Sequence, residues 1–186
     1  MTATATDFRS LTGTYTIDPA HSRFGFVARH AMVTKVRGAF NDFEGSAVID
    51  GENPANSSAS VTLQVASIDT RNEQRDGHLR TNDFLDAENY PTITFASTSV
   101  SHEGDGDFVV TGDLTIKDVT KSISIPLEFQ GAAKDPFGND RIGLEGSVTI
   151  NRKDWGVNWN AALEAGGVLV SEKVTLEFDV SAIKSE

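Results

Sequence analysis

The sequence predicts an all-β protein that folds as an antiparallel β-barrel. Apolar and polar residues alternate strictly over residues 123–129, 142–150 and 174–180, a pattern typical of strands with one buried face. The chain also contains 11 Phe residues beside only two Trp and two Tyr. Phe buries a large area without a polar group, so this composition indicates a thick apolar interior.

A change of phase within residues 36–50 predicts curvature in the sheet. The apolar and small residues of this run occupy even positions up to Phe40 and odd positions from Phe43 onward. Such a switch implies a β-bulge near residues 41–42, and bulges bend a strand around a barrel.

The other strands follow from alternation and from the polar turns between them. In chain order, the expected strands span residues 14–18, 22–30, 36–50, 61–65, 92–101, 108–117, 122–131, 141–151 and 174–183. Six or more such strands predict an antiparallel sheet with one face buried. Residues 1–12 are polar and predict a flexible tail. The remainder contains no linker or repeat, so we interpret residues 13–186 as a single domain.

One segment departs from the strand pattern and predicts a short helix. Residues 71–81 are strongly polar and contain no β-branched residue before Thr81, and we expect the helix to continue to about Phe84. Asn72 or Thr70 is the expected N-cap. Because the segment connects two strands, we expect it to cover one end of the barrel.

Charge and composition exclude several classes of function. A formal net charge of −11 argues against nucleic-acid binding and against steady docking on anionic lipid. No apolar stretch approaches the roughly 20 residues of a membrane helix, and Met1 to Ser10 lack the features of a signal peptide. We therefore expect a cytoplasmic protein without stable membrane insertion. The absence of Cys excludes disulfides and thiolate metal sites.

No motif predicts catalysis or a metal site. The sequence lacks the nucleophile elbow, the P-loop, the dinucleotide-binding glycines and the zinc-protease helix motif. Its four His residues have no spacing that forces them together, and Asp105 to Asp107 reads as a hairpin turn. We therefore predict no catalytic residues, no metal ligands and no cofactor other than a bound lipid-like ligand.

Strand parity suggests the wall of an apolar pocket and its polar contacts. The candidate wall residues lie on the inferred inner faces of the strands: Phe24, Phe26, Phe40, Ile125, Leu127, Leu144 and Val148. His30 continues the face of Phe26, so it would place a polar group at the end of an apolar interior. Arg75 and His78, on the predicted helix, are the other candidates, with Arg75 able to face an anionic head group. A satisfied core histidine and a solvated helix are the alternatives.

Several motifs, taken together, resemble the YceI-like family, bacterial proteins with a lipocalin-like barrel associated with polyisoprenoid binding. They include Arg75-Asp-Gly-His-Leu79, and they occur in the expected order across residues 15–22, 24–30, 36–45, 67–70, 75–79, 83–84, 90–95, 112–121 and 151–156. Two departures stand out: Tyr15 replaces an expected Trp, and Lys117-Asp118 replaces His-Gly in a turn.

The resemblance implies an eight-stranded antiparallel lipocalin-like β-barrel, with the helix of about 71–84 over a long apolar cavity. It also implies a polyisoprenoid, quinone or fatty-acid-like ligand, bound without catalysis for storage, transport or sensing, and often a homodimer. Two alternatives stay open: a packed barrel that acts as a stress-related or protein-interaction module, and an enzyme acting on an amphiphile. Periodicity alone does not distinguish a filled barrel from a hollow one.

Overall fold

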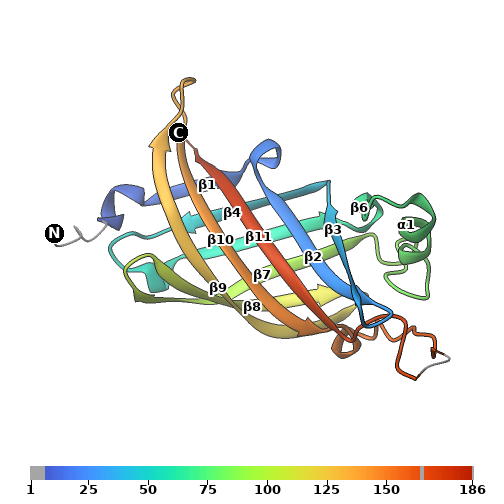
Figure 1. The fold of residues 1–186 in the computed structure, drawn as a ribbon. Coiled ribbons are helices and arrows are strands. Elements are labelled where there is room, and N and C mark those ends of the chain that lie inside the picture. The colour runs from blue at the N-terminus through green and yellow to red at the C-terminus, as the bar shows by residue number, and fades with distance from the viewer. Residues whose placement is uncertain (1–6, 164–165, 186) are drawn as a thin grey trace.

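The computed structural model describes residues 7–163 and 166–185, and its strands form one continuous antiparallel sheet that curls into a barrel (Figure 1). The strands are β1 (Gly13–Ile17), β2 (Arg23–His30), β3 (Thr34–Phe40), β4 (Phe43–Ile49), β5 (Ser58–Gln64), β6 (Ile68–Asp69), β7 (Thr92–Gly104), β8 (Asp107–Ile116), β9 (Val119–Lys134), β10 (Asp140–Asn151) and β11 (Lys173–Lys184).

These strands occupy eight positions around the barrel. β1 and β2 pair with successive parts of β11, at Ile17↔Ala182 and Phe24↔Phe178. β3 and β4 share the next position, and β5 and β6 the one after it. The five long strands β7 to β11 complete the ring, which the β1–β11 pairing closes. The predicted eight-stranded antiparallel barrel is confirmed.

The single strand expected over residues 36–50, with a β-bulge near residues 41–42, is wrong: the chain bends at these two residues and forms two strands, β3 and β4. The neighbouring strands β5 and β6 are separated at the same place. Two hydrogen bonds connect the two breaks: the Asn41 N–H donates to the Ser67 carbonyl, and the Gln64 N–H donates to the Asp42 carbonyl. This break allows Phe40 and Phe43 both to face the interior, where each is less than a tenth exposed. The phase switch in the sequence therefore marks a bend that two neighbouring strand positions share.

The predicted helix is present but shorter than expected. α1 spans Glu73–Leu79 and is capped by Asn72, whose side chain accepts a hydrogen bond from the Arg75 N–H. The expected continuation to Phe84 is wrong because Thr81 starts a turn: its hydroxyl donates to the His78 carbonyl, at 2.6 Å. α1 and the turns after it lie at one end of the barrel (Figure 1).

The predicted N-terminal tail is only partly covered by the structure. Residues 1–6 lie outside the described residues. From Asp7 onward the chain forms a 3-10 turn, Phe8–Leu11, and the Phe8 ring packs edge-on against Phe108 and Phe129 at 5.4 Å. This aromatic contact holds the turn against the sheet.

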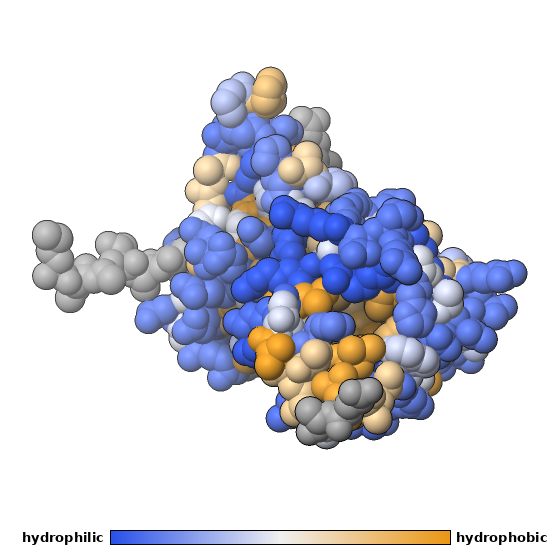
Figure 2. Space-filling model, turned by 45° about the vertical axis from the view of Figure 1, so that its right-hand side comes forward, coloured by the Kyte–Doolittle hydropathy of each residue, from blue (hydrophilic) through white to orange (hydrophobic). Residues whose placement is uncertain are grey.

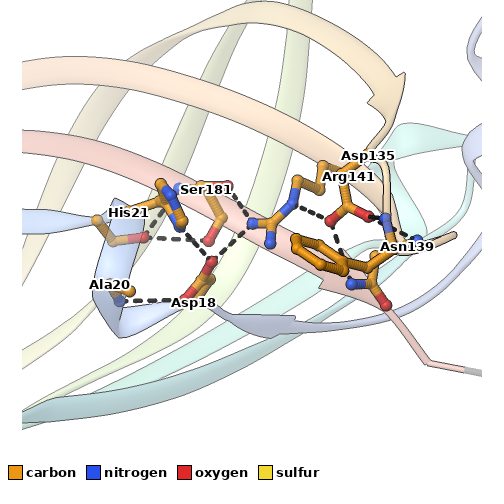
Figure 3. A network of polar contacts seen from close by, with 9 residues as sticks. Asp18, Ala20, His21, Asp135, Asn139, Arg141 and Ser181 are labelled. Carbon is orange, nitrogen blue, oxygen red and sulfur yellow. Dashed lines mark hydrogen bonds and ion pairs between the residues drawn. The ribbon is translucent and has the colours of Figure 1, made fainter.

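A charged network joins the β9–β10 hairpin to the β1–β2 connection (Figure 3). The Arg141 guanidinium lies 2.6 Å from carboxylate oxygens of both Asp18 and Asp135. Asp135 also accepts hydrogen bonds from the Asn139 and Phe137 backbone N–H groups. Burial alone would raise the pKa of Asp135, but the hydrogen bonds from Arg141 and the turn outweigh it and hold the pKa well below its ordinary value.

We expect Asp135→Asn to destabilise the fold at pH 7 and to matter less in acid. A carboxyl whose pKa is lowered on folding stabilises the protein above its unfolded pKa, near 3.9 for Asp, and loses that effect as pH falls toward the folded pKa. Urea unfolding at pH 7, 5 and 3 should therefore show a deficit relative to wild type that shrinks below about pH 4. Asp140→Asn, which alters the exposed neighbour at the start of β10, is the matched control. A deficit that is independent of pH would contradict the prediction.

Candidate ligand-binding cavity

An elongated cavity of about 290 Å³ runs through the barrel. Protein interiors are close-packed and contain few voids larger than a water molecule, so a space of this size is not ordinary core packing. It lies near the lower limit of about 300 Å³ for small-molecule pockets. Of the described residues that line it, Ser46 and Thr94 are polar and uncharged, and Arg152 is charged.

Strand parity located most of the cavity wall. Six of the seven candidate wall residues line the cavity: Phe24, Phe26, Phe40, Ile125, Leu127 and Leu144. The seventh, Val148, is half-buried on the same strand as Leu144 and pairs with Leu176, but it is not part of the lining. Leu176 reaches the cavity where Val148 does not.

Two segments cover the same end of the barrel. We call residues 73–90 the lid and residues 152–163 with 166–172 the closing loop. Leu79, Phe84 and Leu85 of the lid line the cavity, as do Arg152, Val157 and Val170 of the closing loop. Figure 2 shows this side of the molecule, where hydrophobic residues lie in a hollow and along its lower edge, with hydrophilic residues above it.

The Arg75-Asp76 pair holds the lid to the sheet and does not reach the cavity. Asp76 is 4% exposed and accepts hydrogen bonds from the Thr70 N–H, at 2.8 Å, and from the Thr70 hydroxyl, at 2.5 Å. The Arg75 guanidinium donates to the hydroxyl and the carbonyl of the same Thr70. Arg75 is thus part of a local anchor, which differs from the contact with an anionic head group that the sequence suggested.

His78 lies where the lid meets the closing loop. Its ring packs edge-on against Phe84 at 5.0 Å and against Trp159 at 4.8 Å, and its Nε2 lies 2.9 Å from an Asp83 oxygen. His30 is exposed at the end of β2, beside Val170. Neither histidine lines the cavity: His30 is exposed, and the His78 ring packs against Trp159 of the closing loop.

Arg152 is the charged residue of the cavity lining that the sequence analysis did not identify. It follows β10 directly and is 6% exposed. Its guanidinium donates to the carbonyls of Ser171, Val157 and Val170, at 2.8, 2.6 and 3.3 Å. Burial lowers the pKa of Arg152, although the nearby Glu172 carboxylate raises it. An arginine stays protonated in proteins even so, and these carbonyls hold the positive charge within the closing loop, beside an almost wholly apolar cavity surface.

Two features are absent from the part of the chain that the structure describes: a metal-binding cluster and a membrane-spanning helix. Over residues 7–163 and 166–185, no three His, Cys, Asp or Glu side chains gather where they could hold a metal ion. In the same residues, no helix is long and apolar enough to cross a membrane.

Comparison with protein families and curated sequences gives one consistent result. Residues 15–182 match the YceI-like domain. A UPF0312 protein of Staphylococcus aureus strain MSSA476 is 38% identical over 164 residues, which cover 88% of this chain and 93% of that protein. A UPF0312 protein of Photorhabdus laumondii is 42% identical over 148 residues, with 78% and 77% covered.

Solved structures show the same architecture. BcnA of Burkholderia cenocepacia superposes with a TM-score of 0.78 at 25% identity, covering 89% of this chain and 98% of that one. A YceI protein of Campylobacter jejuni gives 0.73 at 29% identity, covering 85% and 90%. A polyisoprenoid binding domain from Saccharophagus degradans gives 0.69 at 16% identity, covering 92% and 98%, and shows the shared fold alone.

Proposed function

The chain belongs to the YceI-like domain family, and from this premise we propose that it binds one long-chain amphiphile and catalyses no reaction. The ligand is a polyisoprenoid, a quinone or a fatty-acid-like lipid, and its apolar chain lies in the barrel. The observation that carries the proposal is the apolar cavity, to which the inner faces of the strands contribute Phe24, Phe26 and Leu144.

Burial of an apolar chain supplies the affinity. Each CH₂ group removed from water contributes about 0.8 kcal/mol before the cost of ordering the chain. A ligand chain gains this contribution along the whole length of the elongated cavity. Because the lining has few polar groups, the cavity discriminates little between a branched and a straight chain. The proposal therefore names a ligand class by its length and apolarity.

Related folds support the ligand class only by analogy. The Saccharophagus degradans domain is described as polyisoprenoid-binding, but a shared fold does not transfer a ligand. The cavity of this chain adds an independent argument, because a long isoprenoid or acyl chain needs an elongated apolar interior of this kind.

The lining also favours binding over the two alternatives. A protein-interaction module has no need of a hollow core, and a cavity left empty would forgo packing contacts. An enzyme would need a nucleophile or general base beside the bound chain. Ser46, Thr94 and Arg152 are the polar residues among the described lining, and none of them has a histidine or carboxylate partner in the structure.

Native mass spectrometry of freshly purified protein, followed by solvent extraction, tests the proposal. We expect a discrete mass excess of one lipid per chain, which extracts as a prenyl or acyl compound. The same spectrum reports whether the chain forms a homodimer. If the protein is purified without lipid and also fails to bind added geranylgeraniol, menaquinone and palmitic acid, the proposal is wrong and the packed module is favoured.

Trp159→Ala should speed the release of the ligand. The Trp159 ring joins the lid to the closing loop through His78 and Phe84, and aromatic contacts of this kind contribute about 0.5 to 1.5 kcal/mol each. Loss of both contacts should favour opening of this end, and we expect about a tenfold faster transfer of a fluorescent fatty acid to acceptor vesicles. Trp155→Phe, which alters the buried indole hydrogen bond to the Leu114 carbonyl, is a control for general loosening. An unchanged rate in Trp159→Ala would show that the ligand leaves elsewhere.

A further inference from the structure

Exposed apolar side chains gather at the end of the barrel that the lid and the closing loop cover. Five large hydrophobic side chains are exposed among the described residues, and three of them lie here: Met32, Val33 and Val168. We call these three residues the apolar tip. Met32 and Val33 stand in the turn between β2 and β3, and Val168 stands in the closing loop. Exposed apolar residues that gather in one place, unlike scattered ones, mark an interaction site.

The two segments that carry the apolar tip are joined to each other. The Ala31 N–H donates to the Leu169 carbonyl, at 2.7 Å. The Met32 side chain lies over Gly167, where an added Cβ would overlap its sulfur. The β2–β3 turn and the closing loop therefore present one surface to the solvent.

The apolar tip is continuous with the cavity. Ala28 and Val170 line the cavity. Met32 lies four residues after Ala28 in the chain, and Val168 lies two residues before Val170. Figure 2 shows hydrophobic residues that continue from the hollow along its lower edge. A lipid that enters or leaves the cavity at this end therefore passes the apolar tip.

The β2–β3 turn does not itself require these side chains. Ala31 and Met32 have φ angles of 50° and 64°, and the Val33 N–H donates to the His30 carbonyl, at 3.1 Å. Asn and Gly are the residues that favour this left-handed backbone in a tight hairpin turn. A methionine at this position is conformationally unfavourable and exposes an apolar side chain, so local stability does not explain it.

Three basic residues lie across neighbouring strands directly behind the apolar tip. Arg29 of β2 is opposite Lys35 of β3, and the register that pairs Thr175 with Val27 places Lys173 of β11 level with Arg29. We call Arg29, Lys35 and Lys173 the basic row. All three are exposed, and none has a carboxylate within ion-pair distance among the described residues. Like charges opposite each other on adjacent strands repel, so in a chain of net charge −11 this row favours an anionic partner outside the protein.

We propose that the apolar tip and the basic row together dock this end of the barrel on a lipid bilayer that contains anionic lipid. The apolar tip enters the interface, and the basic row lies level with the lipid phosphates. Surface-binding segments combine buried apolar area with cations in this way. The negative charge of the rest of the molecule opposes tight binding, so the contact is brief. The inference goes beyond the proposed function, and vesicle binding tests it without a lipid in the cavity.

A second copy of the chain is the competing occupant of the apolar tip. Two copies that meet there would bring two basic rows together, and juxtaposed like charges disfavour such a contact. A bilayer with anionic lipid instead supplies phosphates to the same cations. The arrangement of charge therefore favours the bilayer.

Flotation of the full-length protein with phosphatidylcholine vesicles, with and without phosphatidylglycerol, tests the proposal at low salt. We expect wild type to bind both, and the anionic vesicles at least about threefold more. Met32→Ser combined with Val33→Ser should lower the bound fraction at least about fivefold, because two buried apolar side chains are lost. Lys35→Gln combined with Lys173→Gln should remove the preference for phosphatidylglycerol.

Matched controls come from the β9–β10 hairpin at the opposite end of the barrel (Figure 1). Phe137→Ser removes an exposed aromatic side chain and Lys134→Gln an exposed cation, and both should bind vesicles as wild type does. The proposal is wrong if wild type floats with neither kind of vesicle, or if the controls lose as much binding as the other variants. It is also wrong if the tip variant only converts a dimer into a monomer in light scattering, since a second copy would then occupy the tip. These failures leave lipid binding in the cavity intact, which the mass spectrum decides separately.

Single-cysteine labelling covers the case in which a double variant does not fold. The chain contains no Cys, so Val33→Cys and Phe137→Cys each accept one polarity-sensitive fluorophore. We expect the emission of labelled Val33→Cys to shift to the blue when anionic vesicles are added, and that of labelled Phe137→Cys to stay unchanged. No shift at Val33→Cys, or an equal shift in both proteins, would overturn the inference.

Discussion

Phe26→Asp should reduce lipid binding by at least about 100-fold, the largest functional effect that we expect from one wall residue. Phe26 lines the cavity, packs beside Phe40 with ring centroids 5.9 Å apart, and covers Gly38, where an added Cβ would overlap its ring. A carboxylate here faces an apolar chain that cannot solvate it, and a loss of about 2.8 kcal/mol suffices for a 100-fold change. Displacement of a fluorescent lipid, together with the mass of retained ligand, measures the effect.

Val27→Asp is the matched control because Val27 is the next residue of β2 and lies outside the cavity lining. We expect it to fold and to bind lipid as wild type does. If Phe26→Asp does not fold, Ala28→Phe tests the same wall by filling the cavity with an apolar side chain. A folded Phe26→Asp protein that retains its full ligand would show that the wall is wrongly assigned.

The barrel could be predicted from the sequence because successive side chains of a strand point to opposite faces, so that apolar residues recur at every second position. Parity alone assigned Phe24, Phe26 and Leu144 to the interior, and the phase switch after Phe40 located a real break in the sheet. Alternation fails at the exposed ends of hairpins, where both faces meet water. For that reason β7 and β9 extend beyond their expected limits, as far as Gly104 and Lys134.

The polar part of the site was less accessible to such reasoning. Arg75 and His78 stand in a polar helix, and nothing local to the sequence shows that Arg75 turns back onto Thr70 or that His78 meets Trp159 from a segment about 80 residues later. Arg152 was harder still, because an arginine followed by lysine and aspartate reads as a surface turn. Its burial depends on the closing loop, whose carbonyls fold over it.

Asp76→Ala removes the anchor of the lid and should have the second large effect. We expect it to lower the free energy of unfolding by about 2 to 4 kcal/mol. Asp76 is buried and accepts from two donors of Thr70, which is itself 3% exposed. The substitution leaves both donors buried without an acceptor, and each such group costs about 1 to 3 kcal/mol. Urea unfolding measures the loss, and hydrogen exchange over residues 70–80 should locate it in the lid.

Two variants separate this anchor from a general effect of charge on α1. Asp76→Asn keeps an acceptor in place and should cost clearly less than Asp76→Ala. Glu73→Ala removes an exposed carboxylate from the first turn of the same helix and should change stability by less than about 0.5 kcal/mol. Because the lid closes the end at which the cavity meets Arg152, we also expect faster lipid release from Asp76→Ala. Equal stability of Asp76→Ala and Glu73→Ala would mean that the Thr70 contacts do not hold the lid. The end of the barrel would then depend on the other contacts of the lid, among them the aromatic contacts of Trp159 and the hydrogen bonds from Arg80 to the Ala66 and Ile68 carbonyls.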